Sequence, residues 1–151
     1  MAFKFRLEKV LLHRRSLENI ARKDYMLAIG DLEKEKKILN ELYQKIDLAQ
    51  IERHELVLKG GQYGEELRQY HEYIKGTEKR IERQKNVVSD KMAKVENLQQ
   101  ALQEATVNYK MIEKLEARQR EDYRRAEKKL EEKNLTDMAN VRFLSRRKNE
   151  Q

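Results

Sequence analysis

The chain has 151 residues, 40% of them charged and 38% hydrophobic, with a formal net charge of +7 at pH 7. The absence of cysteine excludes disulfides and thiolate metal sites, and no apolar run approaches the roughly 20 residues that a membrane-spanning helix needs. No uninterrupted apolar stretch follows the basic N-terminus, so we expect no secretory signal and a soluble intracellular protein. The lack of proline and the abundance of Glu, Lys, Leu, Ala and Gln favour long helices over a globular core.

A first helix is predicted at about residues 4–58, because apolar residues recur there at steps of three and four. An extra step between Ala28 and Leu32 reads as a stutter, which would locally unwind a supercoil. Arg14, Asp24, Glu35 and Arg53 occupy positions of this seam, so the helix is expected to be a less ideal coiled-coil partner. The apolar seam positions are Phe3, Leu7, Val10, Leu17, Ala21, Ala28, Leu32, Leu39, Leu42, Ile46, Ala49 and Leu56.

Three of the five glycines lie in residues 59–64, where they predict a turn. Glycine adopts positive φ without steric cost and so can end one helix before the next begins. Glu65 and Glu66 follow at once and suit the positive end of a helix dipole.

A second, longer helix is predicted at about residues 65–140, followed by a basic tail at 141–151. Alternate steps of three and four from Leu67 to Leu130 reach nineteen positions, of which fourteen are apolar or aromatic. A stripe that repeats every 3.5 residues must wind left-handedly around another stripe to stay dry. The helix would be roughly 95 Å long, with no enclosed pocket, so we expect function to depend on its faces and ends.

The short glycine turn favours an all-α fold in which residues 1–151 form a single domain, an antiparallel coiled-coil hairpin. A parallel homodimer of straight helices is the alternative, and the glycines disfavour it. Facing residue numbers in the hairpin would sum to about 124, which places Phe3 beside Glu121 and leaves later residues without a partner in the same chain. The apolar residues of this overhang predict contact with another protein; they are Leu130, Leu135, Met138, Val141, Phe143 and Leu144.

The positive charge is concentrated near both termini. Residues 1–23 hold seven Lys or Arg against two acids (+5), residues 114–151 hold twelve against eight (+4), and the remainder comes to −2. A hairpin would bring the two basic segments to one end, which would attract an acidic partner or phosphates.

No catalytic, metal or cofactor site is recognisable. The three histidines have no second histidine three or four residues away, and the glycine segment lacks the lysine and Ser/Thr of a P-loop; the histidines are His13, His54 and His71. A two-helix structure also offers no water-excluded cleft for acid–base chemistry. Tyr63, Tyr70 and Tyr73 cluster after the turn, and Tyr73 lies off the seam, so it is a candidate contact residue.

Two stretches resemble FliJ proteins, a soluble component of the bacterial flagellar type III export apparatus. The first is Phe3-Lys4-Phe5-Arg6-Leu7-Glu8-Lys9-Val10-Leu11 with His13-Arg14-Arg15. The second runs from Glu113-Lys114-Leu115 through Arg118, Glu121-Asp122-Tyr123 and Glu127 to Asn134-Leu135-Thr136-Asp137-Met138-Ala139. FliJ proteins more often have Asp-Glu where this chain has Thr136-Asp137. Length, turn and basic ends agree along essentially the whole chain.

The resemblance implies a non-enzymatic coiled-coil stalk at the cytoplasmic face of the inner membrane, at the flagellar base. Its implied partners are the hexameric flagellar export ATPase, the cytoplasmic domain of the export gate and the export chaperones, with no small-molecule substrate and no nucleic acid. The expected contacts with the ATPase ring are Phe3, Arg6, Leu7, Val10, Arg14, Arg118, Tyr123, Arg124, Arg125 and Leu130. The expected contacts with the gate are Tyr70, Tyr73 and Ile74.

Two other functions fit the residues alone. Basic helices forking from a zipper could bind nucleic acid, although acids interleave with the bases and the turn opposes a parallel dimer. The chain could also be a purely structural spacer.

Overall fold

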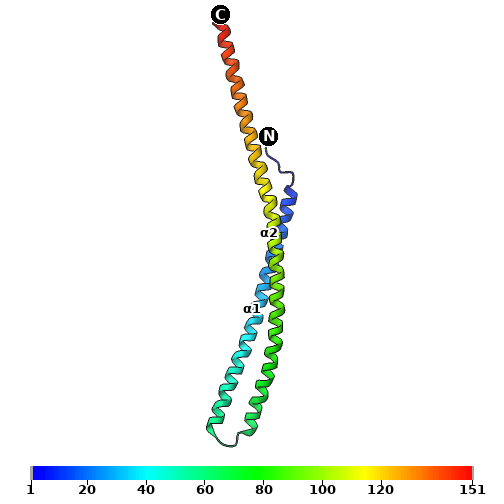
Figure 1. The fold of residues 1–151 in the computed structure, drawn as a ribbon, viewed down its shortest axis with the longest axis vertical. Coiled ribbons are helices and arrows are strands. Elements are labelled where there is room, and N and C mark those ends of the chain that lie inside the picture. Colours follow the sequence, from blue (N-terminus) through cyan, green and yellow to red (C-terminus); the bar gives the residue numbers. More distant parts are fainter. Residues whose placement is uncertain (1, 151) are drawn as a thin grey trace. The chain divides into compact units, whose positions relative to one another are not determined.

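A computed structural model describes residues 2–150, which form two helices, α1 at Glu8–Lys59 and α2 at Gly64–Asn149 (Figure 1). The helices pack against each other, α2 is the longer, and residues 2–150 contain no strand, so the predicted all-α fold is confirmed. The chain divides into two compact units. The terminal unit comprises Met1–Glu18 and Ala105–Gln151, and the turn unit comprises Asn19–Glu104. The single domain over residues 1–151 stays a prediction.

The turn unit is an antiparallel helix pair closed by residues 60–63 (Figure 1). Gly60 and Gly61 have φ of 66° and 112°, values that favour glycine. The Gly60 N–H donates to the carbonyl of Val57 (3.3 Å), and the Tyr63 carbonyl accepts from the N–H of Leu67 (2.9 Å) as α2 begins. A Cβ on Gly61 would approach Tyr63 Cε2 to 3.3 Å, so glycine also leaves room for this ring.

The core of the turn unit consists of Ile46 and Ala49 from α1 and Ile74 and Ile81 from α2, all buried. Burying each Ile side chain contributes about 1.5–3 kcal/mol. Thr77, only 1% exposed, fits the same seam because its hydroxyl donates to the Tyr73 carbonyl of its own helix at 2.8 Å. The helices therefore approach closely without an unsatisfied polar group.

A polar pair interrupts this apolar seam. Gln84 Nε2 donates to the Glu35 carbonyl at 2.9 Å and to Glu35 Oε2 at 2.6 Å. A polar side chain at a seam position fixes the alignment of the two helices, because sliding by one residue would leave it unpaired. Glu35 is one of the charged residues that the sequence places in the seam.

The seam of α1 differs from the prediction in its first half. Val10 and Leu17 are 38% and 40% exposed, and Asp24 is exposed. The buried or half-buried positions step regularly by three and four, with no stutter: Leu7, Leu11, Arg14, Glu18, Ala21, Tyr25, Ala28 and Leu32. The predicted stutter is therefore wrong. It arose because the predicted seam runs through Val10, Leu17 and Asp24. The inner face of α1 carries the next residue in each case: Leu11, Glu18 and Tyr25.

Both helix ends that lie in the terminal unit also differ from the prediction. α1 begins at Glu8 and not near residue 4, because residues 2–7, the N-terminal segment, are not helical and bury Phe5. α2 continues to Asn149 and not to about 140, so the predicted basic tail is helical up to that residue. No glycine or proline interrupts the sequence after Gly76, and the basic residues Arg146, Arg147 and Lys148 suit the negative end of the dipole.

The last part of α2 has no partner within the described chain. All residues from 124 to 150 are exposed, as the overhang in the sequence predicts. In the terminal unit the N-terminal segment lies beside α2, and α2 continues past it (Figure 1). Neither described helix is apolar over a stretch long enough to cross a membrane.

Candidate functional site

An aromatic and basic cluster joins the N-terminal segment to α2 in the terminal unit. The rings of Phe3 and Tyr123 lie 5.6 Å apart between centroids at an interplanar angle of 49°. The guanidinium carbon of Arg120 lies 5.2 Å from the Phe3 centroid, and its Nη2 contacts Glu116 Oε1 at 2.9 Å. Stacking and cation–π attraction thus hold the segment on α2. The pair Phe3–Tyr123 lies within two residues of the Phe3–Glu121 pairing that the sequence predicts.

Most of the other residues predicted to contact the ATPase ring are accessible in the same unit. Arg6, Val10, Arg118, Arg124, Arg125 and Leu130 are exposed, while Leu7 and Arg14 are half-buried. Arg125 Nε lies 3.5 Å from Glu121 Oε1, an exposed pair worth little. The structure brings Phe3 and Tyr123 together, whereas the remaining residues are distributed along residues 6–14 and along α2.

Sequence reasoning missed Phe5 and Arg120. Phe5 is 8% exposed and anchors the N-terminal segment, and Arg120 covers the ring of Phe3. The alternation of Phe3, Phe5 and Leu7 with polar residues was the available signal, since a period of two does not fit an α-helix. In the structure these three side chains are buried or half-buried, and the residues between them are exposed.

The terminal unit carries the entire net charge of the chain. Its 18 Lys and Arg against 11 acids give +7, whereas the turn unit holds 16 of each and is neutral. Beyond Asp137 the described helix has no acid until Glu150, and none of Arg142, Arg146, Arg147 and Lys148 forms an ion pair among residues 2–150. We call residues 130–149 the tail helix. Its five largest apolar side chains beyond Leu130 are more than half exposed: Leu135, Met138, Val141, Phe143 and Leu144.

A groove of about 510 Å³ lies between the helices of the turn unit, close to the turn. Tyr70 and Tyr73 line it, as do the carboxylates of Glu52 and Glu66; the other lining residues are Lys45, Leu48, Ala49 and Gln69. The Tyr70 hydroxyl donates to Glu52 Oε2 at 3.1 Å. This hydrogen bond, with partial burial and nearby carboxylates, raises the pKa of Tyr70 above its ordinary value of 10.0.

Of the three predicted gate contacts, two line the groove of the turn unit and one lies in its core. Tyr73 is 45% exposed and Tyr70 half-buried, so both reach the groove. Ile74 is 5% exposed and lies in the core beneath them. Tyr70 packs against that core, so it links the interior of the unit to the groove.

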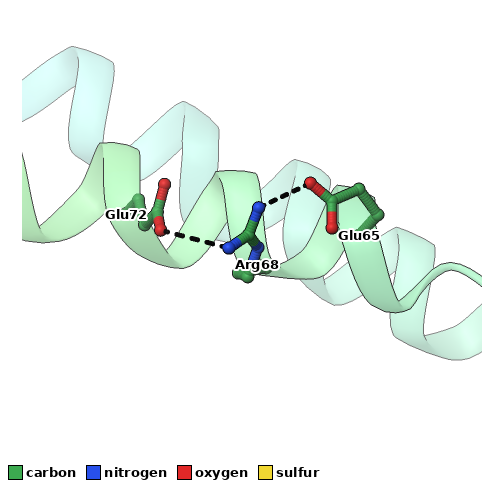
Figure 2. Close-up of polar contacts among 3 residues, drawn as sticks. All are labelled: Glu65, Arg68 and Glu72. Atoms are coloured by element: carbon green, nitrogen blue, oxygen red, sulfur yellow. Dashed lines mark hydrogen bonds and ion pairs between the residues drawn. The ribbon is translucent and has the colours of Figure 1, made fainter.

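The first turns of α2 beside the groove are ordered by a three-residue ion-pair chain (Figure 2). Arg68 Nη2 lies 2.7 Å from Glu65 Oε1, and its Nη1 lies 4.0 Å from Glu72 Oε1. Such exposed pairs contribute a few tenths of a kcal/mol each. Both ion pairs use Arg68, which is the only arginine in this part of α2. Arg68 therefore does not pair with the Glu66 carboxylate that lines the groove.

The composition of these surfaces suits protein binding. Among the described residues no cluster of three His, Cys, Asp or Glu could hold a metal ion. Both the groove and the surface of the terminal unit combine exposed aromatic or aliphatic side chains with charged side chains. This is the composition of protein contact sites.

Comparison with known proteins identifies the family to which the chain is similar. The family model described as "Flagellar FliJ protein" matches residues 3–148. The chain is similar to a curated flagellar FliJ protein of Bacillus subtilis (strain 168), with 24% identity over 144 residues that cover 95% of this chain and 97% of the relative. No solved structure matches the chain.

Proposed function

The chain belongs to the FliJ family, a non-enzymatic family of flagellar export proteins, and from this we propose that it couples an export ATPase to the membrane export gate. It is a component of the flagellar export machinery. In our proposal the terminal unit binds the hexameric ATPase ring, and the groove of the turn unit binds the cytoplasmic domain of the gate protein. Export chaperones are further partners, and the site of action is the cytoplasmic face of the inner membrane at the flagellar base.

The single observation that carries the ring assignment is the composition of the terminal unit. It holds all of the net charge of +7 together with the unpartnered apolar residues of the tail helix. Positive charge accelerates association with an acidic surface, and apolar side chains supply affinity once the charges have met. Phe3, Tyr123 and Arg120 hold the N-terminal segment on α2, so both parts of this unit can contact one partner.

The gate assignment is supported by the groove. Tyr70 and Tyr73 are rigid aromatic side chains with a polar end, the residue type most often found at the centre of binding sites. Ile74 supports them from the core and is too buried to touch a partner itself. The neutral turn unit also contrasts with the basic terminal unit, so the two surfaces suit different partners.

ATP hydrolysis by the purified flagellar export ATPase tests the proposal. We expect the full chain to raise the rate and a chain lacking residues 125–151 to lose most of this effect. All residues from 125 to 150 are exposed in the structure, so their removal should leave the packed helices intact. The matched control is Tyr73→Ala, which alters the groove and should keep the stimulation while weakening binding to the gate domain. Unchanged stimulation by the truncated chain would contradict the ring assignment.

A further inference from the structure

The tail helix and the groove have complementary surfaces. We propose that the tail helix of one copy docks into the groove of a second copy, so that the protein self-associates head to tail. The docking itself does not depend on the proposed export role. It places an apolar and basic helix face of one molecule against a groove of another that is lined by apolar side chains, two carboxylates and one lysine.

The face of the tail helix that carries the inference is formed by Val141, Leu144, Arg147 and Lys148, which together with Ser145 line a shallow surface hollow. Val141 and Leu144 lie one turn apart and are more than half exposed. Arg147 and Lys148 follow Leu144 after three and four residues, so they lie on the same side of the helix, one turn further on. Neither cation forms an ion pair within residues 2–150.

The groove presents the opposite charge with the same spacing. Leu48 is exposed, and Glu52 follows it after four residues on α1. On the tail helix, Lys148 follows Leu144 after four residues. A locally parallel alignment therefore sets Leu144 against Leu48 and Lys148 against Glu52. Glu66, on the α2 side of the groove, is then available to Arg147.

Charge selects a second copy of this chain as the occupant. Residues 41–72, around the turn, hold seven acids and four Lys or Arg, a net charge of −3, while the terminal unit carries +7. Two tail helices repel each other, as do two turn regions, so only the head-to-tail arrangement joins opposite charges. Such a heterologous contact can be repeated from copy to copy.

Docking would cover Tyr73 of one copy together with Val141 and Leu144 of the other. These are surfaces that the proposed function assigns to the gate and the ATPase. The associated form would then be a reservoir that the partners release by competing for the same residues. This consequence rests on the proposed function, whereas the contact does not.

Sedimentation velocity of the full chain tests the contact. We expect concentration-dependent association in 0.1 M NaCl that is lost in 1 M NaCl, where the Debye length falls from about 10 Å to about 3 Å. Glu52→Lys with Glu66→Lys should weaken association about tenfold, and Arg147→Glu with Lys148→Glu should do the same. Combining all four substitutions in one chain should restore it. The control Glu78→Lys with Glu96→Lys makes the same charge change at exposed positions of α2 that do not line the groove, and it should preserve association.

Cross-linking tests the alignment, because the chain has no cysteine of its own. A disulfide requires Cα atoms within about 7 Å, so a mixture of Leu48→Cys and Leu144→Cys chains should form a mixed dimer. Leu48→Cys mixed with Leu130→Cys should not, because Leu130 lies fourteen residues from Leu144.

Three results would overturn the inference. They are a monomer at every concentration in 0.1 M NaCl, association that is as strong in either double variant alone as in the parent chain, and association that survives deletion of residues 125–151. Each leaves the proposed function standing if ATPase stimulation is normal. Conversely, a chain that self-associates as described but does not stimulate the ATPase overturns the proposed function alone.

Discussion

The terminal unit and the turn unit use the same two helices in opposite ways. In the turn unit apolar side chains from α1 and α2 are buried against each other, and positive and negative charges cancel. In the terminal unit the only buried residues are Phe5 and Glu18 among those described, and the net charge is +7. The turn unit therefore supplies most of the stability, and the terminal unit keeps its apolar and basic side chains available to partners.

The strongest test of this contrast is to truncate one large apolar side chain in each unit in turn. Ile81→Ala should lower the free energy of unfolding by about 2–5 kcal/mol, because it leaves a cavity in the core of the turn unit. Leu144→Ala in the tail helix should change it by less than about 0.5 kcal/mol. Urea unfolding followed by circular dichroism measures both. Equal losses would show that the tail helix is packed and not free.

The turn offers a second, smaller effect. Gly61→Ala should cost about 1–3 kcal/mol, because a φ of 112° is strained for any residue with a Cβ and because that Cβ would contact the ring of Tyr63. Gly30→Ala is the control, since Gly30 is helical with open space around its Cβ position, and it should stabilise the protein slightly. Thermal unfolding compares the two. A Gly61→Ala chain as stable as the parent would show that the turn adopts another conformation.

The hydrogen bonds between Gln84 and Glu35 allow a test of what fixes the register of the two helices. Gln84→Ala should cost about 1 kcal/mol, because Glu35 loses the two hydrogen bonds that Gln84 donates. Gln100→Ala, at an exposed position of the same helix, should be close to neutral. Chemical unfolding gives the stability, and amide hydrogen exchange of residues near Glu35 reports alignment. If the two substitutions behave alike, the pair does not fix the register.

The smallest effect is electrostatic and lies at the groove. The hydrogen bond to Glu52 favours the neutral phenol of Tyr70, so folding raises its pKa. The resulting stabilisation is fully present below pH 10.0, the ordinary pKa, and is lost as pH rises through the higher folded value. Ultraviolet titration should show tyrosines that ionise late, and one of them should be lost in Tyr70→Phe.

A matched variant separates the two main causes of the raised pKa of Tyr70, the hydrogen bond to Glu52 and burial. Glu52→Gln should return the titration of Tyr70 toward pH 10.0, because the carboxylate is removed while the shape of the side chain is kept. Tyr109 serves as an internal reference, since its hydrogen bond to Glu113 raises its pKa in the other unit and both substitutions leave it unaltered. An unchanged titration of Tyr70 in Glu52→Gln would show that burial and not the hydrogen bond raises its pKa.

Local sequence determined the helices, the turn between them and the seam of α2. A 3.5-residue apolar repeat specifies a coiled coil without reference to the rest of the chain, and Gly60 and Gly61 specify positive φ. The predicted seam of α2 is buried or half-buried at every position from Leu67 to Glu116. The proposed ring and gate contacts stay predictions, although the structure shows that Ile74 belongs to the core.

Tertiary packing decided which of two adjacent residues of α1 lies on the inner face of the helix, a choice that the sequence of α1 alone does not make. Leu17 and Glu18 are neighbours, and hydrophobicity alone predicts Leu17 on the inner face of α1, whereas the structure buries Glu18. In the same way Tyr25 is half-buried where the predicted seam has Asp24. The groove and the contact of Phe3 with Tyr123 join residues far apart in sequence. Periodicity along one helix determines which side is apolar, but the atoms of the opposite helix determine which neighbouring residue fills the space between them.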